Sequence, residues 1–125
     1  MLTANRVLIL EDEPILAMLL ARIVADLGHG VLATVGSVAQ ALVAVRCVRP
    51  DLMIVDKRLR DGSGVAAVQQ ISLAGFVPHV FVSGETCSVV APRPGSVTLE
   101  KPYVIAELAH AIQTVLSDFP SPSVP

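Results

Sequence analysis

Five short apolar runs recur along the chain, each followed by polar residues or glycine. They lie at residues 6–10, 31–35, 52–55, 80–82 and 96–99. Continuous apolar, β-branched runs of this length are typical of strands buried on both faces of a parallel sheet. Between the runs, apolar residues recur at helical spacing and predict helices at residues 14–27, 38–48, 65–73 and 103–119. This alternation predicts an α/β fold with a doubly wound, five-stranded parallel sheet and right-handed crossovers.

The first predicted helix is apolar over more than one face. Gly28 ends it, and Ser37 is the expected N-cap of the next helix. The residues expected to face the core are Leu16, Leu19, Leu20, Ile23 and Leu27. Ile15, Met18 and Val24 fall outside this stripe, which leaves apolar surface for a partner. In the last helix, the expected core residues are Leu108, Ile112, Val115 and Leu116.

Two segments do not follow the pattern. Residues 85–95 contain Pro92, Pro94 and Gly95, so the fourth helix of the alternation is expected to be short or disordered. Residues 120–125 are rich in proline and serine and are expected to form a disordered tail or the start of a linker. One domain is therefore predicted over residues 1–119.

Composition narrows the function. Apolar residues make up 53% of the 125 residues and charged residues 16%, but no apolar run is long enough to cross a membrane. With no signal-peptide pattern, a cytoplasmic protein is expected. A net charge of −2 without a basic cluster argues against nucleic-acid binding. Cys47 and Cys87 lack metal-ligand spacing and are expected to have no role in chemistry.

Polar side chains that can bind a metal ion or react lie at or just after the ends of four of the predicted strands. They are Glu11, Asp12, Asp56, Ser83 and Lys101. In open α/β sheets the carboxyl ends of the strands meet at the edge where ligands bind, so these side chains are expected to converge. Three adjacent carboxylates require a cation, and oxygen ligands favour Mg²⁺. The charges then balance, because three carboxylates are offset by Mg²⁺ and one lysine.

Such a cluster suits phosphoryl transfer. A carboxylate beside Mg²⁺, an ammonium group and a hydroxyl can attack phosphorus and form an aspartyl phosphate, here on Asp56. Lys101 would stabilise the phosphoryl oxygens, and Ser83 would donate its hydroxyl to one of them. Each residue alone has a plainer interpretation as a surface charge or a turn residue. Their joint occurrence in this order favours the functional interpretation.

Residues 5–117 closely resemble the receiver domain of two-component response regulators. The resemblance rests on Glu11-Asp12, Asp56 with Gly64 eight residues later, Ser83-Gly84 and Lys101-Pro102. It implies a flavodoxin-like (βα)5 fold and transfer of a phosphoryl group to Asp56 from a sensor histidine kinase or a histidine phosphotransfer protein. It also implies Mg²⁺ dependence, a metal ligand at the backbone carbonyl of Arg58, a cis Lys101–Pro102 peptide and no external substrate.

The chain departs from the family pattern at three places. Thr98 replaces an aromatic that commonly rotates on activation, Arg60 replaces a proline, and the interval between Ser83 and Lys101 is short. Residues 78–84, PHVFVSG, are also similar to the signature of an atypical, often single-domain receiver subset found mainly in alphaproteobacteria. The match is partial, because Val82 stands where that signature has alanine.

These departures suggest how a signal would leave the domain. Output would use residues 85–95 or the apolar face of the first helix, which is also a candidate homodimer surface. An ion pair between Arg58 and Glu85 would cover the site and prolong the phosphoryl lifetime.

The chain is expected to be a single-domain regulator that acts on an unknown downstream protein. The alternatives are the receiver of a longer regulator, a constitutive binding module, and a haloacid-dehalogenase-like phosphohydrolase, which would need a carboxylate where Arg58 stands.

Overall fold

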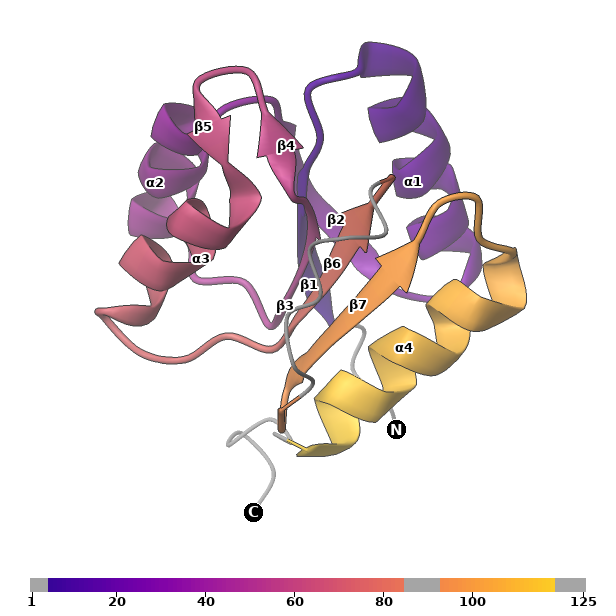
Figure 1. Cartoon of the computed structure of the whole chain (residues 1–125). Coiled ribbons are helices and arrows are strands. Elements are labelled where there is room, and N and C mark those ends of the chain that lie inside the picture. The colour runs from indigo at the N-terminus through magenta and orange to yellow at the C-terminus, as the bar shows by residue number, and fades with distance from the viewer. Residues whose placement is uncertain (1–4, 85–92, 119–125) are drawn as a thin grey trace.

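The computed structural model describes residues 5–84 and 93–118. Five parallel strands form one sheet in the order β2-β1-β3-β6-β7 (Figure 1). Their bounds are β1 Arg6–Leu10, β2 Gly30–Val35, β3 Leu52–Asp56, β6 His79–Ser83 and β7 Ser96–Glu100. The predicted fold class and all five predicted strands are confirmed.

Four helices lie in the described residues, two on each face of the sheet. Their bounds are α1 Pro14–Asp26, α2 Val38–Cys47, α3 Gly64–Ser72 and α4 Ile105–Asp118. In Figure 1, α1 and α4 cover one face, while α2 and α3 cover the other. The predicted weak helix falls mainly on residues 85–92, which lie outside the described residues, as does the predicted tail.

The central strands are buried on both faces, which explains their unbroken apolar runs. Side chains of a strand alternate between the two faces of a sheet. Val7 and Ile9 of β1 therefore join the core under α1 and α4, while Leu8 and Leu10 join the core under α2 and α3. All four are fully buried, as are the corresponding residues Leu52, Met53, Ile54 and Val55 of β3.

The predicted core stripe of α1 is partly wrong. Leu20 is buried as predicted, but Leu16 is 36% exposed and Leu19 is 53% exposed. The fully packed residues are Ala17, Leu20 and Val24, at helical spacing, while the predicted Ile23 and Leu27 are partly buried against the same core. Because most residues of α1 are apolar, the hydrophobic pattern does not identify which face is buried. The displaced leucines leave an apolar surface beside the carboxyl edge of the sheet.

The ends of the helices mostly agree with the predictions. The Ser37 side chain accepts a hydrogen bond from the Gln40 backbone amide at 3.1 Å, so it caps α2 as predicted. In α4, Leu108, Ile112 and Val115 are buried and Leu116 is partly buried, although the helix begins two residues later than predicted.

A short hairpin that the sequence did not predict follows β3. It consists of β4 Arg58–Leu59 and β5 Gly62–Ser63, and it joins the end of β3 to the start of α3. Leu59 anchors it in the core under α2 and α3.

Candidate functional site

The carboxyl ends of β1, β3, β6 and β7 border one pocket of about 610 Å³. Strand register aligns these ends, since Asp56 lies opposite Val82 in one pair and Ser83 lies opposite Glu100 in the next. The predicted site residues that line the pocket are Asp12, Asp56, Arg58, Ser83 and Lys101. Glu11 lies behind them and contacts Lys101.

Three carboxylates meet at this edge, as predicted. Glu11, Asp12 and Asp56 each offer an oxygen, and these oxygens lie within 4.8 Å of one another. Glu11 is only 4% exposed, and its Oε2 accepts a hydrogen bond from the Glu13 backbone amide at 3.1 Å. Burial raises the pKa of Glu11 above its ordinary value, against the lowering effect of the Glu13 amide, and the Asp56 charge raises it further. Close carboxylate oxygens that repel one another in this way fit a hard divalent cation such as Mg²⁺, which prefers oxygen ligands.

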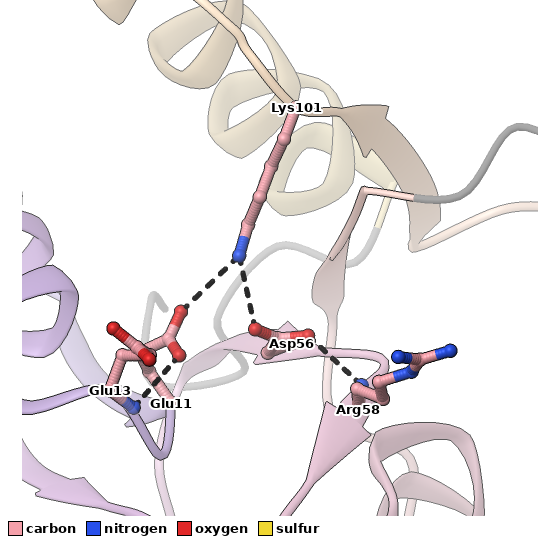
Figure 2. Close-up of polar contacts among 5 residues, drawn as sticks. All are labelled: Glu11, Glu13, Asp56, Arg58 and Lys101. Carbon is pink, nitrogen blue, oxygen red and sulfur yellow. Dashed lines mark hydrogen bonds and ion pairs between the residues drawn. The ribbon is translucent and has the colours of Figure 1, made fainter.

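Lys101 extends between two of these carboxylates (Figure 2). Its Nζ lies 3.1 Å from Asp56 Oδ2 and 3.6 Å from Glu11 Oε1. Burial alone would lower the pKa of Lys101, but the hydrogen bond and charge of Asp56, together with Glu11, raise it above its ordinary value. Lys101 is therefore a fixed positive charge at neutral pH. The Lys101–Pro102 peptide is cis, as predicted.

Both oxygens of the Asp56 carboxylate have a donor. Oδ2 accepts from Lys101, and Oδ1 accepts from the Arg58 backbone amide at 2.9 Å (Figure 2). The carboxylate is therefore held in one orientation at the end of β3. The sequence analysis assigns Arg58 a metal ligand through its carbonyl and an ion pair through its side chain. The contact to Asp56 comes from its backbone amide and was not predicted.

Ser83 ends β6, is 4% exposed and lines the pocket, so it lies where the sequence predicted. The Lys101 amide donates to the Ser83 carbonyl at 2.8 Å, which fixes the two strand ends together. Thr98 is half-buried in β7. The predicted ion pair between Arg58 and Glu85 stays a prediction, because Glu85 lies outside the described residues.

A second cavity, of about 440 Å³, adjoins the site and was not predicted. Apolar residues of α1 form one wall, and Tyr103 and Pro102 form another. Glu11 and Lys101 also line it, so the lysine is shared by both cavities. Burial raises the pKa of Tyr103, which keeps its hydroxyl neutral. Its position two residues after Lys101 was the only signal in the sequence.

The fold and site together define a response regulator receiver domain, the phosphoacceptor module of two-component signalling. The family model for the response regulator receiver domain matches residues 7–113. The chain belongs to this family.

Individual relatives of the chain are also response regulators. The phyllosphere-induced regulator PhyR of Methylorubrum extorquens is 32% identical over 118 residues, which are 90% of this chain and 44% of PhyR. The transcriptional regulatory protein PdtaR of Mycobacterium tuberculosis is 29% identical over 119 residues, covering 92% of this chain and 58% of PdtaR. The chain thus spans about half the length of these curated relatives.

Solved structures show the same fold. The receiver domain of Erythrobacter litoralis PhyR superimposes with a TM-score of 0.82 at 30% identity, over 98% of this chain and 97% of that domain. None of the helices in residues 5–84 and 93–118 combines the length and hydropathy that a membrane span requires.

Gly64 provides a test of how tightly the loop after Asp56 is packed. A Cβ at Gly64 would overlap the Asp56 carbonyl oxygen and lie 2.6 Å from Val55 Cγ1. We expect Gly64→Ala to lower the free energy of unfolding by about 2 kcal/mol or more, because the Asp56 carbonyl is a backbone group that cannot move without displacing Asp56. Urea denaturation measures this change.

The matched control is Gly84→Ala, at the residue that directly follows β6 and lines the pocket. A Cβ at Gly84 meets no atom within 4 Å, so we expect a change below about 0.5 kcal/mol. Equal destabilisation by the two substitutions would contradict this description of the loop.

Proposed function

We propose that this chain is a cytoplasmic, phosphorylation-dependent receiver that accepts a phosphoryl group on Asp56 and signals through protein contacts. The observation that carries the proposal is the held carboxylate of Asp56, with Lys101 on one oxygen and the Arg58 amide on the other. A carboxylate fixed in this way, at the mouth of a pocket that also contains a buried serine, is prepared to act as a nucleophile. The protein turns over no external substrate.

The reaction would run as follows. A carboxylate oxygen of Asp56 forms a bond to phosphorus, while the bond between phosphorus and the imidazole nitrogen of a donor phosphohistidine breaks. Lys101 and Ser83 donate hydrogen bonds to the phosphoryl oxygens. Glu11, Asp12, Asp56 and the Arg58 backbone carbonyl would hold Mg²⁺, which would offset the charge of the phosphoryl group.

Phosphorylation would then change the charge balance that holds the site. The aspartyl phosphate would carry roughly one more negative charge than the free carboxylate, and it adds new acceptor oxygens. Lys101 and Ser83 would reorient toward these oxygens. Because Lys101 also lines the cavity under α1, this change would reach a surface on which partners dock.

That surface is the best-supported docking site for the phosphodonor. Ile15, Leu16, Met18 and Leu19 form an apolar α1 surface, with exposed fractions of 72%, 36%, 72% and 53%. A donor histidine has to approach Asp56, and this surface lies beside the phosphoacceptor pocket. Residues 14–21 contain no charged side chain, so a donor protein would bind here mainly by apolar burial. The donor would be a sensor histidine kinase or a histidine phosphotransfer protein.

Phosphorylation can be tested without a protein donor. We expect acetyl phosphate with Mg²⁺ to add one phosphoryl group to the wild-type chain and none to Asp56→Ala, as measured by intact mass. Lys101→Met should reduce the rate by about a hundredfold, because it removes the ammonium from the transferring group. An unmodified wild type would refute the proposal and favour a constitutive binding module, whereas modified Asp56→Ala would place the acceptor elsewhere.

A substitution on the apolar α1 surface should impair docking of the donor protein without changing the chemistry at Asp56. We expect Met18→Glu to slow phosphotransfer from a phosphorylated donor protein by at least about tenfold, because a charge would be buried in an apolar contact. Phosphorylation by acetyl phosphate should stay within about twofold of wild type. Leu73→Glu is the control, since Leu73 is 88% exposed at the end of α3 on the opposite face.

Two results would overturn this assignment. The first is equal phosphotransfer to Met18→Glu and to wild type. The second is a wild type that is a dimer by light scattering and a Met18→Glu variant that is a monomer, which would assign the surface to a second copy of the chain.

A further inference from the structure

The tip of the β4–β5 hairpin is attached to the start of α2, a helix that is distant in the sequence. Asp61 lies at this tip, and its Oδ1 accepts a hydrogen bond from the Val38 amide at 2.7 Å. Its Oδ2 accepts from the Ala39 amide at 3.2 Å. The Asp61 carboxylate therefore satisfies two of the backbone donors that a helix leaves open at its N-terminus. Its negative charge also lies at the positive end of the helix dipole.

Arg60, the other residue of the hairpin loop, lies against the loop that precedes α2. A Cβ at Gly36 would lie 2.7 Å from Arg60 Nη2 and 3.4 Å from Asp12 Cα, so the guanidinium lies against Gly36 next to the β1–α1 loop. Here the chain departs from the family pattern, in which a proline occupies the position of Arg60. The hairpin tip thus lies against the loop before α2 at Gly36, and Gly36 in turn lies beside Asp12.

The base of the hairpin is attached to a second helix. Ser63, the last residue of β5, accepts a hydrogen bond from the Ala66 amide at 3.0 Å and caps α3. Ser63 is also the strand partner of Arg58, whose amide donates to Asp56 Oδ1. The hairpin is therefore fixed at its tip by α2 and at its base by α3, and Arg58 lies at the base, opposite Ser63.

From this arrangement we propose that Asp61 is a positioning residue for the phosphoacceptor: it attaches the hairpin to α2 and so holds the Arg58 amide on Asp56. Asp61 touches neither Asp56 nor the transferring group; it acts through the hairpin. Loss of the Asp61 carboxylate would free the tip, and the Arg58 amide would then be held only by the Leu59 anchor and the base of the hairpin, which position it less tightly on Asp56. The inference rests on the proposed function only where it concerns phosphorylation.

Ser37→Ala is a matched control for Asp61→Ala. Each variant removes a side-chain cap from the N-terminus of α2, because Ser37 binds the Gln40 amide while Asp61 binds the amides of Val38 and Ala39. Only Asp61 belongs to the hairpin. A purely structural role in α2 would therefore produce the same defects in both variants.

Two measurements at a temperature well below unfolding test the proposal. The first is hydrogen exchange of the Arg58 amide by NMR, without metal or phosphodonor. We expect exchange at least about tenfold faster in Asp61→Ala and within about twofold of wild type in Ser37→Ala. The second is the rate of phosphorylation by acetyl phosphate with Mg²⁺, which should fall about tenfold or more in Asp61→Ala but not in Ser37→Ala. Asp61→Asn, which keeps one acceptor oxygen, should recover part of both.

The outcomes are distinguishable. Arg58 exchange that is unchanged in Asp61→Ala, or equally fast in both variants, overturns the positioning role. If wild type takes up no phosphoryl group, the proposed function fails, while the exchange measurement still decides whether Asp61 fixes the hairpin. Phosphorylation of Asp61→Ala at the wild-type rate, in a chain whose wild type is phosphorylated, also overturns the proposal.

Discussion

Three carboxylates held at one edge of the sheet are the constraint on which the site depends. Glu11, Asp12 and Asp56 lie within 4.8 Å of one another because the register of parallel strands ends them at the same level. Lys101 supplies one positive charge between two of them. Two negative charges remain, which is the charge that one divalent cation neutralises. Burial is the main cause that raises the pKa of Glu11, and the neighbouring charge of Asp56 adds to it.

Lys101 also connects the chemistry to the surface. Its side chain lines the pocket at Asp56 and the apolar cavity beside α1, where Tyr103 forms part of the wall. Any change that draws Lys101 away from Glu11 alters both cavities. Because Thr98 stands in β7 where receiver domains commonly have an aromatic, we propose this shared lysine as the route from the site to the apolar α1 surface.

The strands and the convergence of the site residues could be predicted because their signals are unambiguous. A strand buried on both faces has an unbroken apolar run, as in Leu52 to Val55, and topology brings the strand ends together. The Ser37 cap is also visible in the sequence, because the residue lies beside the helix that it caps. Asp61 caps the same helix from 22 and 23 residues away, and no local pattern reveals such a contact.

Other features were missed for related physical reasons. The buried face of α1 could not be identified, because exposed Leu19 and buried Leu20 look alike in the sequence. Strands of two residues, such as β4 and β5, show no periodicity. The Arg58 contact to Asp56 comes from a backbone amide, which every residue except proline possesses, so residue identity carries no information about it. The arginine side chain at this position also speaks against the haloacid-dehalogenase alternative, which requires a carboxylate there.

The central claim is that Asp56, together with Mg²⁺, holds a phosphoryl group in this site. The most direct test is thermal unfolding with beryllium fluoride and Mg²⁺, which together mimic a phosphorylated aspartate. A ligand that binds only the folded state raises its stability by mass action. We predict a clear rise in the unfolding temperature of wild type that requires both components and is absent in Asp56→Asn. An equal rise in Asp56→Asn, or none in wild type, would contradict the account.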